Sequence, residues 1–154
     1  MIFGVSCTKN AVVIARATGS GETFSIASIR AIAFQARSGS DLKELLQRLV
    51  AIFGRGGQRR RSTIALLASS SGRFKSSVEA IKAEAITELA AAESGLPVVR
   101  VSAAGFKRVL GCAPGQKWQV RAEERFNPAG RHKNWSRGAA GAATAAFKVV
   151  VGNA

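Results

Sequence analysis

Three apolar runs follow one another at the N-terminus, and the hydrophobic period changes directly after them. The runs are Ile2–Val5, Ala11–Ala17 and Phe24–Phe34, and short polar breaks separate them. This pattern predicts three β-strands in an antiparallel meander. Apolar residues then recur at helical spacing from Leu42 to Phe53. The chain is therefore restricted to folds that begin with a small sheet and continue with helices.

The predicted first helix has a start signal and a stop signal. Asp41 can cap its start, with Glu44 three residues further on. Gly54 suits its end, because glycine readily adopts the left-handed conformation that terminates many helices. The next stretch, Arg55–Arg61, reads RGGQRRR, and we expect a flexible basic loop there.

Two short runs, apolar except for Arg100 in the second, predict strands that are buried on both faces. They are Thr63–Ala68 and Val98–Val101, and we expect them to be central neighbours of Ile2–Val5 in one sheet. Between them, Ser76 and Glu79 form a capping-box pattern that opens a second helix. The apolar residues that line one face of this helix are Val78, Ile81, Ala85 and Leu89.

The C-terminal part predicts two further helices. Ser102 can cap a short helix that carries Phe106, and Gly138–Val151 is an alanine-rich apolar stretch typical of a packed terminal helix. Residues 111–137 between them are expected to be rich in loops. The order is thus β-β-β-α-β-α-β-α-loop-α. It indicates a mixed α/β sheet with helices on its faces, in a single domain that spans residues 1–154.

The charge of the chain favours a nucleic-acid partner. Lys plus Arg number 23 against 9 Asp plus Glu, a formal net charge of +14. A surface of this kind attracts phosphates and releases counterions on binding them. Acidic membranes, or positive charge that serves solubility alone, remain alternatives. No run reaches the roughly 18 apolar residues that a membrane span needs.

The cysteines and the first residues suggest a cytoplasmic protein. Cys7 and Cys112 are far apart and lie in no metal-ligand spacing, and the start of the chain shows no signal peptide. We therefore expect free thiols in a reducing compartment.

Three short motifs occur in a fixed order in the second half of the chain. They are Ser102–Lys107 (SAAGFK), Gly111 with Lys117–Val120 (KWQV), and Gly138–Ala142 (GAAGA). They resemble a helix-opening segment with a lysine, a G…K-x-Q-V stretch and a D-A-A-D-A stretch of RuvC-type Holliday-junction resolvases. Gly72–Leu89 also resembles uncharacterised bacterial relatives in the same superfamily. The resemblance implies a ribonuclease H-like, RuvC-like fold, with an N-terminal antiparallel meander and helices on both faces.

The resemblance also implies a site that this sequence does not complete. The family uses clustered carboxylates to hold two divalent metals that hydrolyse phosphodiesters. The matching positions here are Ser6 on the first strand, Ser69 near the end of the fourth strand, and Gly138 and Gly141 at the start of the last helix. We therefore expect no cleavage and no cofactor; Mg²⁺ would enter only in a nuclease with a rearranged site. Four other acids share the second predicted helix, where a solvated outer face is the expected role: Glu79, Glu84, Glu88 and Glu93.

Basic residues and aromatics supply the candidate contacts to nucleic acid. Arginine binds phosphate through a planar fork of donors, and aromatic rings stack unpaired bases at about 1–3 kcal/mol per base. In the basic loop, a backbone clamp and a merely solvated surface are equally open. We expect Trp118 to pack on the core and Trp135 to stack. The candidates are Arg55, Arg59, Arg60, Arg61, Arg73, Phe74, Lys75, Lys107, Lys117, Arg131, Lys133, Trp135 and Arg137.

Together these features predict a nucleic-acid-binding protein on a RuvC-like nuclease fold that has lost its metal site. Branched or single-stranded forms are the expected ligands, and DNA is favoured over RNA. Two other classes stay open, an active metal-dependent endonuclease with a rearranged site and a protein-interaction scaffold. A homodimer is also open.

Overall fold

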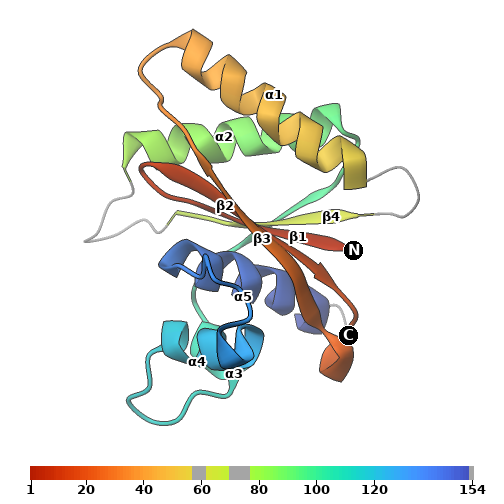
Figure 1. Ribbon diagram of the computed structural model, residues 1–154, viewed down its shortest axis with the longest axis vertical. Coiled ribbons are helices and arrows are strands. Elements are labelled where there is room, and N and C mark those ends of the chain that lie inside the picture. Colours follow the sequence, from red (N-terminus) through yellow and green to blue (C-terminus); the bar gives the residue numbers. More distant parts are fainter. Residues whose placement is uncertain (57–61, 70–76, 153–154) are drawn as a thin grey trace.

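The computed structural model describes residues 1–56, 62–69 and 77–152. A five-stranded mixed sheet lies between two layers of helices (Figure 1). The strand order across the sheet is β3-β2-β1-β4-β5. The strands are β1 (Ile2–Cys7), β2 (Ala11–Thr18), β3 (Ser25–Ala33), β4 (Thr63–Leu67) and β5 (Val98–Val101). The helices are α1 (Gly39–Gly56), α2 (Val78–Glu93), α3 (Phe106–Leu110), α4 (Trp118–Phe126) and α5 (Arg137–Gly152), with short 3₁₀ turns at Gly21–Thr23 and Pro128–Gly130.

The first three strands form the predicted antiparallel meander. β1 pairs with β2 and β2 pairs with β3, both antiparallel, whereas β4 pairs parallel to β1 and β5 pairs parallel to β4. Parallel neighbours need a crossover connection. α1 supplies it before β4, and α2 supplies it before β5. The mixed α/β fold predicted from the sequence is confirmed.

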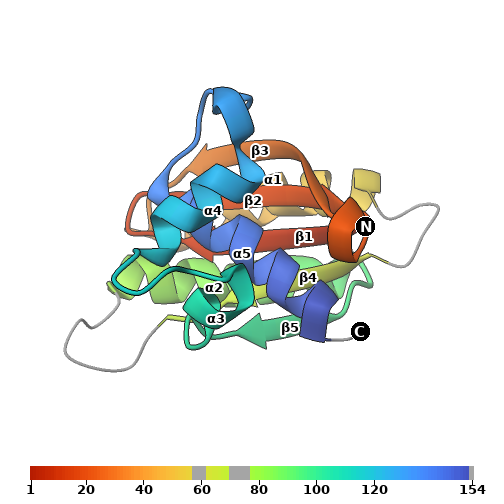
Figure 2. The same ribbon diagram turned by 90° about the horizontal axis from the view of Figure 1, so that it is seen from below.

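Helices cover both faces of the sheet, and α5 comes closest to it. α1 and α2 lie on one face, and α3, α4 and α5 lie on the other (Figures 1 and 2). Alternate residues of β1 serve the two layers. Phe3 and Val5 are buried in the cluster under α1 and α2, whereas Gly4 and Ser6 face α5.

β5 is an edge strand, so the prediction that it is central was wrong. It pairs with β4 alone. Val101 is buried, but Val99 is 40% exposed and Arg100 is also exposed. The sequence of a run of only four residues does not show whether its strand lies at the centre of the sheet or at the edge.

Both predicted boundaries of α1 were wrong. The cap is Ser38, whose Oγ accepts a hydrogen bond from the Asp41 backbone N–H at 3.3 Å, while Asp41 accepts one from the Arg37 backbone N–H at 3.0 Å. The helix continues through Gly54 to Gly56. Gly54 is not among the glycines with positive φ, and glycine ends a helix only where the backbone turns left-handed.

The cap and the buried face of α2 also differ from prediction. Ser77 caps the helix and accepts a hydrogen bond from the Ala80 N–H at 3.1 Å; the predicted cap, Ser76, lies outside the described residues. The apolar stripe faces solvent, since Val78, Ile81 and Leu89 are 63%, 53% and 45% exposed. The face turned to the sheet carries Ala80, Ala83, Glu84, Thr87, Ala90 and Ala91. Small side chains predominate on this face, because they let the helix pack closely against the sheet.

The stretch 111–137 is less loop-rich than predicted, because it contains α4. This helix is only nine residues long, and its two arginines and two glutamates leave too few apolar positions to give a clear period in the sequence. α3 is capped by Gly105 at φ 82°, and not by the predicted Ser102. Cys7 and Cys112 are both free thiols, as predicted. Across the described ranges, no helix is long and apolar enough to cross a membrane.

Candidate nucleic-acid interface at the start of α5

The motif positions on β1 and α5 meet in space. A Cβ atom placed on Gly141 would lie 3.2 Å from the Ser6 Oγ and 2.9 Å from Leu67 Cδ2. One turn earlier in the helix, a Cβ on Gly138 would lie 2.6 Å from Val13 Cγ2. The fold therefore brings together three of the four positions at which the resemblance implied acids.

The packing at these positions leaves little room for a side chain. Contacts under 3.0 Å require something to shift, and both glycines fall below that limit. The closest approach is at Gly4 on β1, where a Cβ would stand 1.8 Å from the backbone oxygen of Ala142. Glycine on both elements thus lets α5 lie directly on β1. A carboxylate at 138 would require Val13 to shift, and one at 141 would require Leu67 to shift.

Ser69, the fourth position, is engaged on the other face of the sheet. Its backbone N–H donates to Glu84 Oε1 at 2.7 Å, and its hydroxyl also hydrogen-bonds the same oxygen. Glu84 belongs to α2, whereas Ser6 faces α5. The fold therefore does not bring Ser69 into the group formed by Ser6 and the two glycines.

Glu84 is buried, which corrects the prediction of a solvated outer face. It is only 5% exposed, and its Oε2 accepts a hydrogen bond from Arg100 Nη2 at 3.1 Å. The other Arg100 Nη group bonds Glu88. The Glu88 hydrogen bond and the charges of both carboxylates raise the pKa of the Arg100 guanidinium, against a smaller opposing effect of burial. Both oxygens of Glu84 are thus already occupied. Of the four acids of this helix, Glu93 alone is exposed, as predicted, while Glu79 and Glu88 are half-buried.

The side chains at the motif positions do not fit the two-metal site of the resolvase family. Hydroxyls and bare glycines cannot neutralise two divalent cations, which need several carboxylate oxygens. Within the described ranges, no three His, Cys, Asp or Glu side chains lie together as a metal-binding group. The side chains at these positions therefore support no reaction step that depends on such a metal pair.

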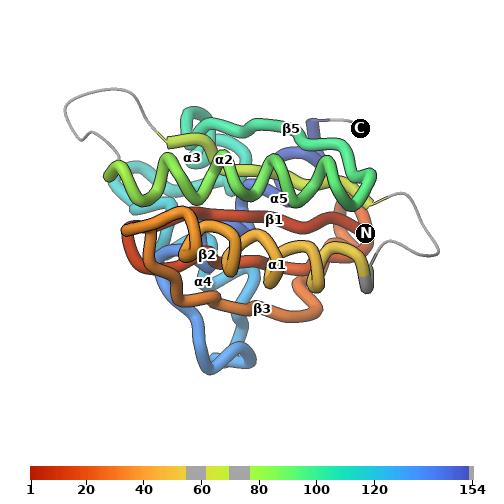
Figure 3. Tube along the Cα trace, turned by 90° about the horizontal axis from the view of Figure 1, so that it is seen from above, coloured from red at the N-terminus to blue at the C-terminus, as the bar shows by residue number. Residues whose placement is uncertain are grey.

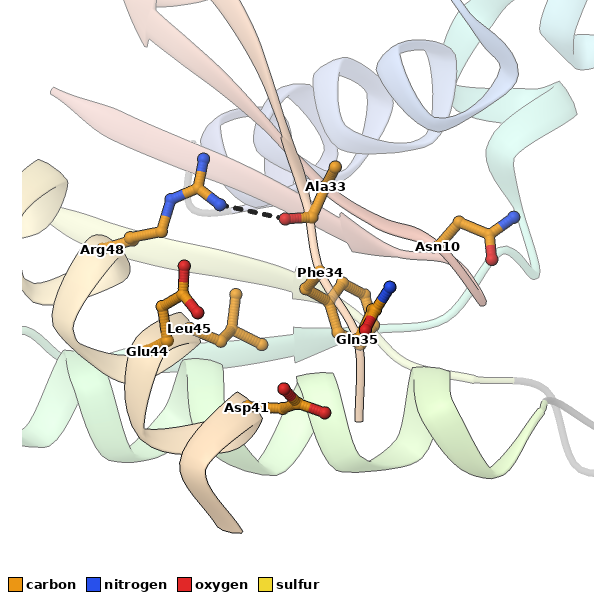
Figure 4. A pocket seen from close by; sticks show the side chains of 8 residues that line it. All are labelled: Asn10, Ala33, Phe34, Gln35, Asp41, Glu44, Leu45 and Arg48. Carbon is orange, nitrogen blue, oxygen red and sulfur yellow. Dashed lines mark hydrogen bonds between the residues drawn. The ribbon is translucent and has the colours of Figure 1, made fainter. Parts of the chain in front are cut away.

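A pocket that contains carboxylates lies between the end of β3 and the start of α1 (Figure 4). This pocket of about 480 Å³ is lined by Asp41, Glu44 and Arg48, among others. Arg37 forms an ion pair with Asp41 at 3.8 Å, and Arg48 donates to the backbone oxygen of Ala33 at 3.0 Å. Arginines lie beside the carboxylates of Asp41 and Glu44, and the described lining residues include no third acid. The pocket therefore does not supply a rearranged catalytic site.

Apart from Arg55 of α1, the described basic candidates belong to the segment from α3 to α5, which lies on one side of the sheet (Figure 2). Arg137 opens α5, and Ser136 caps that helix by accepting a hydrogen bond from the Ala139 N–H at 3.2 Å. The exposed candidates of this side are Lys107, Lys117, Arg131, Lys133 and Arg137, and Arg108 and Arg125 are exposed there too. We call the five candidates the basic face.

The other candidates cannot be added to that face. Arg55 lies in the last turn of α1, while Arg59, Arg60, Arg61, Arg73, Phe74 and Lys75 lie outside the described residues. Gly56 and Ser62, on either side of the undescribed arginines 59–61, stand near the amino end of β4, whereas Ser6 stands near the carboxyl end of the parallel strand β1. These two flanking residues therefore lie at the opposite end of the strands from Ser6.

The two tryptophans lie in different environments. Trp118 packs edge-on against Phe106, with ring centroids 5.0 Å apart, which confirms the prediction of core packing. Trp135 is half-buried and lines a pocket of about 290 Å³ together with Arg137 and Ala140 of α5. It therefore stands beside the start of α5, and stacking on a base stays a prediction.

Sequence reasoning missed the links from Glu84 to Ser69 and Arg100. One signal was available: Glu84 shares a helical face with Ala80, Ala83 and Thr87, and small residues at this spacing mark a side that packs closely. It also missed Arg16 and Arg30, which stand on strands of the meander within apolar sequence.

Comparison with known proteins supports the fold. No protein-family model matches the chain, and no curated protein matches it. The structure of Thermus thermophilus RuvC matches at a TM-score of 0.71 and 14% identity, over 98% of this chain and 96% of that one. T. thermophilus RuvC in complex with a Holliday junction substrate matches at 0.74 and 14% identity, over 99% and 96%. Strand order, helical layers and these matches together show that the chain has the ribonuclease H-like fold of RuvC.

Proposed function

We propose that this chain binds nucleic acid on a RuvC-type nuclease fold without cleaving it. The observation that carries the proposal is the packing of α5 on β1 through Gly4, Gly138 and Gly141, which fills the space where metal-binding side chains would stand. A retained fold with a closed metal site suits a protein whose remaining activity is binding.

The charge around this site supports binding of phosphate. Arg137 of the basic face opens α5 and Lys133 precedes it by four residues, so these two cations stand at the amino end of the helix, whose backbone N–H groups favour anions. Acids at positions 138 and 141 without metal would repel a phosphate backbone, and glycine removes that repulsion. The Holliday junction held by the T. thermophilus neighbour supports a preference for branched DNA here. Binding of single-stranded forms is part of the proposal through Trp135, whose ring could stack on an unpaired base. A cytoplasmic setting with reduced Cys7 and Cys112 is part of the proposal.

A cleavage assay separates this function from that of a nuclease with a rearranged site. Purified protein is incubated with four-way junction, duplex and single-stranded DNA in Mg²⁺ or Mn²⁺, and no product is expected. Glu84→Gln serves as the diagnostic variant, since Glu84 is the most buried acid of α2. Metal-dependent cleavage that persists through stringent purification and is lost in this variant would establish the nuclease instead.

A salt titration tests the basic face. Each phosphate contact contributes a slope of roughly −0.9 in log K against log salt for B-form DNA. The variant Lys117→Ala/Lys133→Ala/Arg137→Ala should therefore flatten the slope by up to about 2.7. Lys43→Ala/Lys82→Ala, which removes exposed cations of α1 and α2 on the opposite side of the sheet, is the control and should change it little.

Two outcomes of this titration decide between the alternatives. Replacing Arg59, Arg60 and Arg61 with alanine flattens the slope if that segment clamps the backbone, and an unchanged slope makes it a solvated surface. If no nucleic acid binds even at about 50 mM salt, where electrostatic binding is strong, the scaffold function replaces the proposed one.

The proposed phosphate site at the start of α5 can be tested with a triple acid variant, Ser6→Asp/Gly138→Asp/Gly141→Asp. In EDTA it should bind DNA more weakly than the unmodified protein, because three carboxylates add repulsion where phosphate is proposed to sit. Mg²⁺ should restore part of the binding. Equal binding in EDTA would move the phosphate site away from this surface, towards Trp135 and the Arg59–Arg61 segment.

A homodimer through α2 is the proposed assembly. Val78, Ile81 and Leu89 form an exposed apolar stripe on this helix, and a stripe of this kind on a soluble protein commonly marks an interface. Two-fold symmetry would bury the same stripe of both copies. Light scattering after size exclusion should show a dimer that Ile81→Glu/Leu89→Glu converts to a monomer. A monomeric unmodified protein would refute this assembly and leave the binding proposal intact.

A further inference from the structure

A small pocket lies between α4 and the start of α5, on the α5 side of the sheet. Its volume is about 290 Å³, just below the range of about 300–1,000 Å³ that is usual for ligand sites, so it suits a single ring system. The chain between α4 and α5 extends past β3 and is not covered by α1 or α2 (Figures 2 and 3). We call this site the α4–α5 pocket. Its lining residues are Gln119, Val120, Glu123, Trp135, Ser136, Arg137 and Ala140.

Trp135 gives this pocket an aromatic surface that is available for stacking. The side chain is half-buried and packs against the hydrophobic cluster that includes Ala140. Among the described residues, no aromatic ring and no cation stacks on it, whereas the ring of Trp118 packs on Phe106. Val120, which is 48% exposed, adds apolar surface to the same pocket. An indole anchored in this way suits the flat face of an unpaired base.

Two polar side chains of α4 line the same pocket without a partner. Gln119 and Glu123 are four positions apart in the helix and therefore share one of its faces. In the part of the chain that the structure describes, neither side chain has a hydrogen bond or an ion pair. The neighbouring Glu124, in contrast, pairs with Arg121 at 3.3 Å and accepts a hydrogen bond from Gln116. The Glu123 carboxylate and the Gln119 amide are thus both available to a ligand.

The carboxylate of Glu123 matches the edge of a base better than a phosphate. An ionised carboxylate accepts hydrogen bonds and donates none, and it repels a phosphate backbone. Arg137 lines the pocket with Glu123, yet the two form no ion pair, so the guanidinium can hold a phosphate beside the pocket. The base donors that a carboxylate can accept from include the exocyclic amino groups of adenine, cytosine and guanine, whereas thymine has carbonyl oxygens in their place.

We propose that the α4–α5 pocket holds one unpaired base of the bound nucleic acid and favours bases with an exocyclic amino group over thymine. Trp135 would stack on the base, and Glu123 would accept a hydrogen bond from the amino group. The Gln119 amide would donate to an acceptor atom beside that group. This inference rests on the proposed binding of nucleic acid and adds the class of base that the binding selects.

The test uses DNA hairpins that carry one bulged nucleotide in the stem and differ only at that nucleotide. The bulge is adenine, cytosine, guanine, thymine or an abasic site, and a fully paired hairpin is the reference. In fluorescence anisotropy at one fixed low salt concentration, the three amino-bearing bases should bind at least about fivefold more tightly than thymine.

A pair of variants shows whether Glu123 makes this selection. Glu123→Gln should reduce the preference over thymine to less than about twofold, because an amide can also donate to a carbonyl oxygen. Glu124→Gln removes the same charge from the adjacent residue, which does not line the pocket, and should retain the preference. Both residues are exposed, so neither change should disturb folding.

Stacking on Trp135 has a readout of its own, which is tryptophan fluorescence. The chain has two tryptophans, so Trp118→Phe leaves Trp135 as the sole reporter and keeps an aromatic ring beside Phe106. The adenine bulge should quench this fluorescence, whereas the abasic and the fully paired hairpins should not. Trp135→Leu should reduce the preference for the adenine bulge over the paired hairpin by at least about fivefold.

The outcomes separate this inference from the proposed function. Equal binding of all bulges, no quenching of Trp135, or an equal loss of preference in Glu124→Gln would each overturn the base pocket, while binding of the paired hairpin would leave the proposed function intact. If free deoxyadenosine monophosphate quenches Trp135 as fully as the adenine bulge at the same concentration, the pocket is a nucleotide site and the inference is also wrong. No binding of any hairpin at low salt would overturn both.

Discussion

Replacing Gly4 with alanine should destabilise the protein strongly, because it forces α5 off the sheet. The new Cβ would stand 1.8 Å from the Ala142 oxygen, whereas ordinary contacts begin at 3.4 Å, so the helix must retreat by about 1.6 Å. The obstacle is backbone, which cannot rotate away as a side chain can. Overpacking of a core costs about 1–3 kcal/mol, and we expect the upper end, about 3 kcal/mol. The gain from a stiffer unfolded chain, about 0.4–1 kcal/mol, does not offset this cost.

The measurement is urea unfolding followed by far-UV circular dichroism. In thermal unfolding of a chain of this length, the same loss of about 3 kcal/mol would lower Tm by about 6–12 °C. Gly54→Ala is the matched control: it makes the same chemical change on exposed α1, where the new Cβ meets nothing within 4 Å. Helix propensity predicts that this control gains up to about 1 kcal/mol. If Gly4→Ala were as stable as the unmodified protein, the close approach of α5 to β1 would be wrong, and with it the argument that the metal site is closed.

Three further outcomes are expected. Gly138→Asp/Gly141→Asp should lower the free energy of unfolding by about 2 kcal/mol or more, measured by the same urea titration, because both new side chains overlap the sheet; full stability would show that the start of α5 has free space. Burial, the largest effect, raises the pKa of the Cys7 thiol from 9.0 to about 12, so its contribution to stability is complete below pH 9 and is lost between pH 9 and 12. The slope is about 1.4 kcal/mol per pH unit and should be absent in Cys7→Ala; parallel pH profiles of the two proteins would contradict it. Glu84→Ala should cost about 2 kcal/mol, because a buried N–H loses its acceptor, whereas Arg100→Ala should cost less than about 1 kcal/mol, since its side chain is 49% exposed; the reverse order would show that the ion pair matters more than the buried carboxylate.

The sequence by itself determined the elements whose pattern is local. The three N-terminal runs alternate with polar breaks, which suffices for a meander, and the repeat from Leu42 to Phe53 suffices for α1. Short motifs in a fixed order were enough to indicate the fold that the structural comparison supports, although no single motif was specific. The identities of Ser6, Gly138 and Gly141 were also available from the sequence, and with them the expectation of a missing metal site.

Only the tertiary structure decided which faces are buried and what the glycines do. The apolar stripe of α2 predicts a core face, yet the sheet takes the alanine face with Glu84, because close approach depends on small side chains and because Ser69 and Arg100 satisfy the carboxylate. A sequence shows that Gly138 lacks a side chain, but the 2.6 Å between its missing Cβ and Val13 depends on how a helix meets a strand more than a hundred positions away. Distances of this kind arise from packing between segments that are remote in the chain, and no local pattern encodes them.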